Sequence, residues 1–315
     1  MKLSIIIPAK DCTNQIKTVC ENTSKWNDKI EVLLVFDGLE DYGAFVREYK
    51  LYPQVKILRT EGNLGPNVGR NLGMDLAQGK YILFLDSDDE FYNIQSVLNG
   101  ILNKSFDGKE VIEFSFEFVD SLSKRLVYSW NKKPDRRHGL SENFVSGYIA
   151  SVCWNKLYLR SFLEGNDLRF FEAHRTGLDG VFTINCLNKT LSYHRIDDLL
   201  VRASYREDSY SRSWTSRNVQ SVISNLELYK GTLSISEYEV FQKKLFRNTL
   251  LLSAFRCDLR DFKISNARIK SNIKLFEMLL LRGSLIYRFF VLMTLWPSLC
   301  WYTIKIIKRT GYKLY

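Results

Sequence analysis

The stretch that most constrains the fold runs from Lys80 to Glu90, where a short apolar run ends in three carboxylates. Tyr81 to Leu85 are all apolar and rich in strand-forming residues, which indicates a buried central strand. Asp86, Asp88 and Asp89 follow directly. Open α/β sheets bind ligands beyond the carboxyl ends of their strands. The acids therefore mark a candidate binding site, with an acidic turn that caps the next helix as the alternative.

The spacing of the first two acids favours a metal. In a strand, residues two apart point to the same side, so Asp86 and Asp88 can face one ligand. Two carboxylates held close together repel unless a cation or hydrogen-bond donors satisfy them. A hard divalent cation that brings a phosphate-bearing substrate meets this need. The pattern predicts a metal and phosphate site at the end of this strand.

Earlier in the chain, short apolar runs alternate with helical patterns. The alternation is typical of parallel βαβ units with right-handed crossovers. Asp37 then shares one sheet edge with Asp86, and Pro8 ends the first strand where a ligand can meet the backbone. We expect an α/β sheet with a nucleotide site at this edge. The expected strands are Ser4–Pro8, Glu31–Phe36 and Val55–Leu58, and the expected helices cover Cys12–Trp26 and Asp41–Tyr52.

A glycine-lined helix is expected between the third strand and the acidic one. Gly65, Gly69 and Gly73 are four residues apart, so they lie along one helix face. Close packing of the helix on the sheet is the structural explanation of this face. Arg70, on the same helix, either neutralises a diphosphate or holds Asp86 in place.

Taken together, these motifs resemble those of the inverting family 2 glycosyltransferases with a GT-A fold. The order and spacing of the motifs are more specific than an isolated Asp-x-Asp. The chain departs from the family at Lys10-Asp11, Phe36, Leu39-Glu40 and Gly69. The matching motifs are Ser4-Ile5-Ile6-Ile7-Pro8, Asp37-Gly38, Asn63-Leu64-Gly65, Arg70-Asn71-Leu72-Gly73, Gly79-Lys80-Tyr81-Ile82 and Asp86-Ser87-Asp88-Asp89.

The resemblance implies a role for each acid at the sheet edge. Asp37 matches the residue that reads the nucleobase, and Asp86 matches the partner of the ribose. Asp88 matches the ligand of a Mn²⁺ or Mg²⁺ ion that bridges the donor diphosphate. Such an ion stabilises the charge of the leaving nucleoside diphosphate without a proton.

Inverting transfer also needs a general base for the acceptor hydroxyl, and the family places an acid for this after a Glu. Here Leu178 stands where that Glu would be, and Asp179 is the expected base. Asp179 also suits an N-cap of a helix from Gly180 to Leu187, and the two roles are compatible. Glu172 and His174 are nearby alternatives.

Three further residues lie in segments that match the same family. Trp154 lies in a segment that borders the sugar pocket in the family, where it either stacks on a sugar or packs in the core. Lys156, close by, either meets phosphate or pairs with an acid. Arg206 falls where family members carry a basic loop over the diphosphate, and an exposed salt bridge is its alternative.

The C-terminal region carries most of the excess positive charge and a long apolar segment. The net charge of +10 calls for an anionic partner. Within Leu285–Lys305, the sixteen uncharged residues between Arg288 and Lys305 are few for a spanning helix, which needs about 20 apolar residues, and Pro297 would kink it. Aromatic and basic residues around it suit headgroups and anionic lipid. We expect a helical hairpin or a bent helix that lies in the membrane interface; a short transmembrane helix and a buried core helix are the alternatives.

Other features of the sequence limit the class of protein to which the chain can belong. No nucleic-acid recognition motif is present, so nucleic acid is not expected as a partner. The six cysteines show no CxxC pair and no compact disulfide spacing, which indicates reduced thiols in a cytoplasmic enzyme. We therefore expect a cytoplasmic protein, peripheral on the inner face of the cell membrane.

The expected fold is α/β: a GT-A fold with a Rossmann-like mixed sheet flanked by helices and a C-terminal helical extension. The expected parts are a nucleotide-sugar-binding half (1–110), an acceptor-binding half with the base (111–215) and the extension (216–315). The expected activity is metal-dependent, inverting hexosyl or N-acetylhexosaminyl transfer from a nucleotide sugar, with UDP preferred, to a glycan or lipid-linked saccharide. The alternatives are a binding protein without transfer activity and another nucleotide-sugar enzyme, such as a nucleotidyltransferase.

Overall fold

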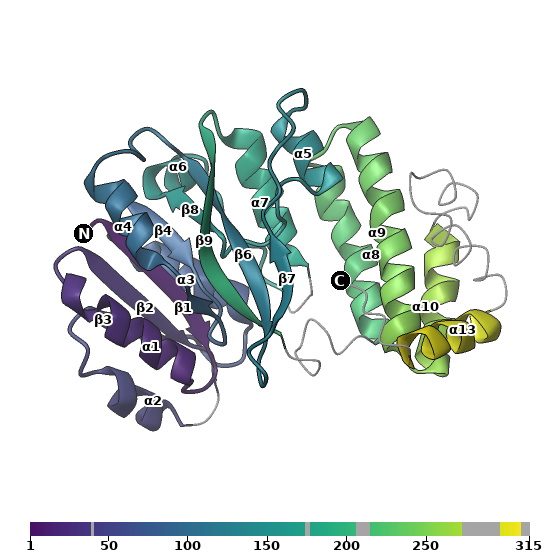
Figure 1. Cartoon of the computed structure of the whole chain (residues 1–315), viewed down its shortest axis with the longest axis horizontal. Coiled ribbons are helices and arrows are strands. Elements are labelled where there is room, and N and C mark those ends of the chain that lie inside the picture. The colour runs from purple at the N-terminus through teal and green to yellow at the C-terminus, as the bar shows by residue number, and fades with distance from the viewer. Residues whose placement is uncertain (39–40, 174–176, 206–214, 273–296, 310–315) are drawn as a thin grey trace. The chain divides into compact units, whose positions relative to one another are not determined.

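The computed structural model forms two compact units, each described here by itself (Figure 1). The first comprises residues 1–174 and 178–205, and the second comprises residues 175–177 and 206–315. The structure describes all residues except 39–40, 174–176, 206–214, 273–296 and 310–315. The expected boundary at residue 110, between two halves of the first unit, stays a prediction.

The first unit alternates strands and helices in its N-terminal part and continues with longer strands. Its strands are β1 (Leu3–Ala9), β2 (Ile30–Phe36), β3 (Val55–Arg59), β4 (Tyr81–Phe84), β5 (Glu90–Phe91), β6 (Val111–Asp120), β7 (Leu126–Trp130), β8 (Lys156–Leu159) and β9 (Tyr193–Tyr205). Its helices are α1 (Asn14–Thr23), a 3-10 turn (Ser24–Trp26), α2 (Tyr42–Tyr49), α3 (Pro66–Leu76), α4 (Ile94–Leu102), α5 (Leu140–Ser146), α6 (Arg160–Gly165) and α7 (Leu178–Lys189).

One sheet joins the strands of this unit in the order β3-β2-β1-β4-β8-β6-β9-β5, with β7 paired to β6. The first four strands in this order are parallel, and Ile6 lies opposite Leu33 on β2 and Phe84 on β4. The predicted parallel βαβ arrangement is therefore confirmed. Asp37 follows β2 and Asp86 follows β4, at the same carboxyl edge. The first strand runs one residue beyond Pro8, so the prediction that it ends at the proline was wrong.

The sheet becomes mixed at β8, which lies antiparallel between β4 and β6. Leu157 is the partner of both Leu83 on β4 and Ile112 on β6. Beyond it, β6 and β9 are parallel and β5 pairs antiparallel with β9. The fully buried strands β1, β2 and β4 supply the centre of the apolar core. The expected Rossmann-like mixed sheet with flanking helices is confirmed.

Close packing positions α3 on β1 and β2. A Cβ atom built on Gly73 would lie 2.4 Å from Cγ2 of Ile6, and one on Gly69 would lie 3.0 Å from Cβ of Pro8. These two glycines therefore serve helix–sheet contact, which was the structural explanation. Gly65 does not share their helix face, because it precedes the helix as its N-cap, with φ of +98°. Pro66 then occupies the first helical turn.

The second unit is helical, as the expected C-terminal extension requires. Trp301 in its last described helix donates an indole N–H to the Cys257 carbonyl at 2.9 Å, and Cys300 and Ile304 are buried. Of the segment Leu285–Lys305, residues 285–296 lie outside the described residues. No described helix is long and apolar enough to cross a membrane. The helices are α8 (Ser216–Lys230), α9 (Ile235–Arg256), α10 (Leu259–Asn272) and α13 (Pro297–Arg309).

Candidate functional site

The three acids after β4 lie in a turn. The strand ends at Phe84, and the amide of Asp89 donates to the Asp86 carbonyl at 3.0 Å. The strand alternation that placed Asp86 and Asp88 on one side does not extend this far, so that part of the prediction was wrong. Thr13, which caps α1, donates its hydroxyl to the Ser87 carbonyl at 2.6 Å and ties the turn to the loop after β1.

Arg70 joins two of the predicted site acids. Its Nη2 donates to Asp86 at 2.6 Å, and its Nη1 donates to Asp179 at 2.9 Å. The arginine is 3% exposed, whereas the carboxylates of Asp86 and Asp179 are 36% and 28% exposed. Burial alone would lower the pKa of Arg70, but the charges of Asp179 and Asp86 outweigh it and hold the pKa above its usual value. A planar guanidinium with several fixed donors suits such a double contact.

Asp179 is the second residue of α7, which begins at Leu178, so it lies inside the first turn and not at the N-cap position that was its alternative reading. Burial raises the pKa of its carboxyl group, the Arg70 charge opposes the rise, and the Asp86 charge adds to it. Cys153, fully buried, contributes a side-chain hydrogen bond to the same carboxylate. A carboxylate of raised pKa is a stronger proton acceptor, which suits a general base.

Two asparagines of α3 hold the backbone segment that leads to the base. Asn71 donates to the Phe170 carbonyl at 2.9 Å and accepts from the Phe170 amide at 2.9 Å. Asn67 donates to the Phe171 carbonyl at 3.0 Å and accepts from Arg70 at 2.8 Å. Asn71 also donates to the Glu172 carboxylate at 2.9 Å. The sequence indicated Asn71 without a role and gave no indication of Asn67, although both residues lie on α3 with Arg70.

The Lys156 side chain, for which the sequence left open a phosphate contact or a pair with an acid, lies in the core. Lys156 is fully buried and donates to the carbonyls of Ala150 and Val152 at 2.7 and 2.8 Å. It pairs with the buried Glu113 at 3.0 Å. Lys156 thus pairs with an acid and fixes the backbone just before Cys153.

Asp37 is 2% exposed and stabilises the loop before α3. It accepts from the Thr60 hydroxyl at 2.6 Å and from the amides of Leu64 and Gly65 at 2.8 and 2.7 Å. The described structure therefore assigns it contacts within the protein. Its role in reading a nucleobase stays a prediction.

Trp154 lies in the aromatic core. Its ring is 4% exposed and meets those of Phe116 and Phe118 with centroids 4.8 and 6.2 Å apart. Packing in the core was one of the two environments that the sequence allowed for Trp154. A contact with sugar stays a prediction. Arg206 lies outside the described residues, as does His174. Asp89 is buried and accepts a hydrogen bond from the Ser204 amide at 2.8 Å. This bond holds the end of β9, the strand that directly precedes Arg206 in the sequence.

The residues present fit a metal that enters with its substrate better than a metal held by protein alone. Among the described residues, no group of three or more His, Cys, Asp or Glu side chains lies close enough to hold an ion. Asp86 is engaged by Arg70, and Asp88 is half-buried in the turn. Magnesium-type sites often use one or two carboxylates and complete their shell with substrate phosphates and water.

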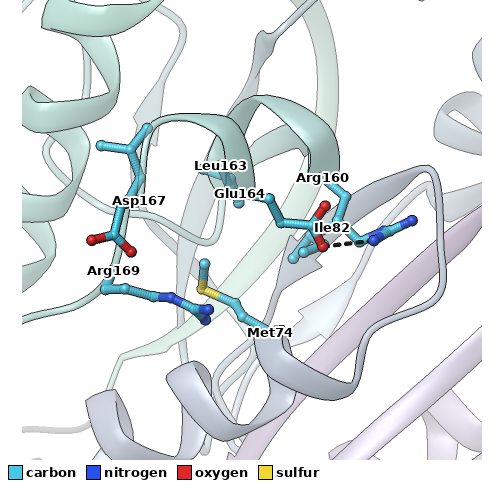
Figure 2. Close-up of a pocket in the computed structure, with 8 residues that line it drawn as sticks. Met74, Ile82, Arg160, Leu163, Glu164, Asp167 and Arg169 are labelled. Atoms are coloured by element: carbon cyan, nitrogen blue, oxygen red, sulfur yellow. Dashed lines mark hydrogen bonds and ion pairs between the residues drawn. The ribbon is translucent and has the colours of Figure 1, made fainter.

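A separate pocket of about 110 Å³ contains none of these site residues. Figure 2 shows Met74 between Arg169 and Glu164, with charged side chains around an apolar floor. Arg160 pairs with Glu164 at 2.6 Å, and Arg169 pairs with Asp75 at 2.6 Å. The pocket is lined by Met74, Ile82, Arg160, Leu163, Glu164, Asp167, Leu168 and Arg169.

Comparison with known proteins gives a consistent result. The model of the family described as Glycosyl transferase family 2 matches residues 4–161. The chain is 37% identical over 95 residues to the uncharacterized glycosyltransferase YibD of Escherichia coli, covering 29% of this chain and 27% of that protein. It is 27% identical over 176 residues to the putative glycosyltransferase EpsH of Bacillus subtilis, covering 53% and 50%. The chain spans half or less of the length of these curated relatives.

Two solved structures share the fold. The Staphylococcus aureus TarS 1–349 complex with UDP-GlcNAc has a TM-score of 0.69 at 17% identity and covers 100% of this chain and 93% of its own. The mannosyltransferase PcManGT from Pyrobaculum calidifontis, with GDP-Man and Mn²⁺, has a TM-score of 0.53 at 12% identity and covers 96% and 86%. At these identities the likeness shows the fold alone.

Proposed function

The chain belongs to glycosyl transferase family 2, and from this premise and the geometry of its site we propose that it is an inverting, metal-dependent transferase that uses a nucleotide sugar. The observation that carries the proposal is the double ion pair of Arg70. It brings the acid after β4 within reach of the acid at the start of α7. Donor and acceptor chemistry thus meet at one sheet edge, as open α/β sheets predict.

Asp179 is the proposed general base. It takes the proton of the acceptor hydroxyl while that oxygen attacks the anomeric carbon and the bond to the nucleoside diphosphate breaks. A single displacement with one base inverts the anomeric carbon. The raised pKa of Asp179 supports this role, because a base works best when its pKa lies nearer the working pH.

Asp88 is the proposed protein ligand of Mn²⁺ or Mg²⁺, with the remaining ligands from the donor diphosphate and water. When bound, the ion neutralises negative charge on the leaving group. Arg70 holds Asp86 at the same turn, so the acid expected at the ribose has a fixed position. Pro8, Asp37, Trp154 and Arg206 remain proposed donor contacts.

A UDP sugar is the proposed donor, because TarS was solved with UDP-GlcNAc and UDP and aligns with the full chain. The proposed acceptor is a hydroxyl of a glycan or of a lipid-linked saccharide. We also propose that the basic C-terminal region holds the protein at the inner face of the cell membrane.

Two variants test the proposed roles in a transfer assay with a panel of nucleotide sugars and Mn²⁺. Asp88→Ala should abolish transfer and metal-dependent donor binding, with an unchanged circular dichroism spectrum. Asp179→Asn should keep donor affinity and lose transfer, since the loss falls on the transition state. Turnover like that of the wild type in Asp88→Ala would exclude it as the metal ligand, and an active Asp179→Asn would place the base elsewhere.

A further inference from the structure

We infer that Phe171 is a sugar-stacking platform for the acceptor, with the Glu172 carboxylate beside it as a hydroxyl acceptor. This inference rests on the proposed function, because it deepens the acceptor side of the same site. It begins from a contrast between neighbours. Phe170 is 2% exposed, whereas Phe171 is 44% exposed. An exposed aromatic ring on a firmly held backbone offers a fixed apolar surface to a ligand.

The backbone at this point is unusually well fixed for a segment outside helices and strands. Asn71 binds both the amide and the carbonyl of Phe170, and Asn67 binds the carbonyl of Phe171. Inside, the Phe170 ring stacks on Phe182 with centroids 3.9 Å apart. The chain that carries the Phe171 ring is thus anchored from two sides. A ring on an anchored backbone offers contact area at a small entropic cost.

The platform lies on the base side of Arg70. The Nη2 group of Arg70 faces Asp86, on the donor side, whereas its Nη1 group binds both Asn67 and Asp179. Asn67 is the residue that holds Phe171. Three hydrogen bonds therefore connect the Phe171 carbonyl to the proposed base. An acceptor must reach that base, so a contact on this side suits the acceptor rather than the nucleotide.

The chemistry of the pair fits a pyranose. The face of an aromatic ring carries negative charge density, which attracts the C–H groups of a sugar face. Glu172 is exposed and held by Asn71 at 2.9 Å, and a carboxylate accepts hydrogen bonds from sugar hydroxyls. Trp154, for which the sequence left open sugar stacking or core packing, is 4% exposed, whereas Phe171 is 44% exposed.

Saturation-transfer NMR tests this inference with the full chain and UDP present. The probes are the methyl β-glycosides of glucose, galactose and N-acetylglucosamine. In the wild type we expect saturation transfer from the protein to the ring C–H protons of at least one glycoside. The affinity for that glycoside should fall about tenfold in Phe171→Ala and stay near normal in Phe171→Tyr. Tyr148→Ala is the matched control, because Tyr148 is exposed to a similar degree, at 42%.

Each outcome has a defined meaning. The inference is overturned if the wild type and Phe171→Ala bind the glycosides with equal affinity, or if no probe receives saturation transfer from the wild type. An equal loss in Tyr148→Ala also overturns it, because the effect would then be general. UDP binding, measured on the same samples by calorimetry, reports separately on the proposed function. If the wild type binds no nucleotide or nucleotide sugar, the proposed function fails whatever the glycosides show.

Discussion

At the scale of single residues, the guanidinium of Arg70 organises the acids of the proposed site. It satisfies two carboxylates that would otherwise repel, and it is itself buried against the ring of Phe170, 5.2 Å from its centroid. A lysine at this place carries the same charge on a single atom. Its three donors radiate from one nitrogen and rotate, so it cannot reach Asp86 and Asp179 from two separate nitrogens in a fixed plane as the arginine does. Geometry, not charge alone, is therefore what the arginine supplies.

Arg70→Lys should lower kcat on the order of 10²-fold, because a misplaced base is costly even when the shift is about 1 Å. The pH profile should move as well. The base works only when deprotonated, so activity falls as pH drops through the pKa of Asp179, which burial raises above its ordinary 3.8. Weaker pairing with the cation raises that pKa further, so the acid limb should shift to higher pH.

The measurement is kcat against pH for the wild type and the variant. Arg169→Lys is the matched control, because this more exposed arginine pairs with Asp75 at the separate pocket. An acid limb that stays in place in Arg70→Lys would show that Arg70 does not set the pKa of the base.

At the scale of elements, α3 is the piece on which the site depends. One of its faces is pressed onto β1 through Gly69 and Gly73, and its side chains Asn67, Arg70 and Asn71 reach the segment before α7. A shift of this helix moves every one of these contacts together. The glycines thus control the site without touching it.

Gly73→Ala should lower the free energy of unfolding by about 1–3 kcal/mol, since its Cβ would lie 2.4 Å from Ile6 in a packed interface. Gly69→Ala should cost less, because its nearest atom is 3.0 Å away. Gly43→Ala, on the exposed face of α2, is the control and should be neutral or stabilising by up to about 1 kcal/mol. Urea titration followed by circular dichroism measures all three, and equal stability of the three variants would refute tight packing.

At this scale, some features of the fold could be predicted from the sequence and others could not. Apolar runs, glycine spacing and strand-ending acids were local patterns, and the parallel strands and the common edge of Asp37 and Asp86 followed from them. The insertion of β8 between β4 and β6 was not predictable, because its pairing joins residues far apart in the chain. The contacts of Asn71 with Phe170 likewise join residues 99 positions apart in the sequence. The burial of Trp154 has the same origin.

At the scale of the whole molecule, the charge distribution separates the two functions that the chain is proposed to combine. The acids of the proposed site lie in the first unit, whereas the basic residues from Arg260 onward lie in the helical second unit. Trp301 and Cys300 show that the described part of the C-terminal segment packs within that unit. Tyr302, 55% exposed, is an aromatic residue that remains available to an interface.

Truncation after about residue 280 should release the protein from anionic vesicles and preserve donor binding. The loss follows because about 1 kcal/mol of attraction per basic residue near the surface disappears. Co-sedimentation with phosphatidylserine vesicles at low salt measures the binding, and neutral phosphatidylcholine vesicles are the control. If the full-length chain fails to sediment with the anionic vesicles, the C-terminal region is not a membrane anchor.

The position of β8 has a consequence for how the chain is made. During synthesis, β4 emerges when its partner β1 is already made, but its other neighbour, β8, arrives only after β5, β6, β7, α4 and α5. Until Leu157 comes to lie opposite Leu83, the nascent protein presents an open, apolar edge, which is a site for wrong pairing with other chains. The segment that closes this edge also carries Cys153 to the side of Asp179. The same segment therefore protects the growing chain against wrong pairing and supplies a neighbour of its proposed base.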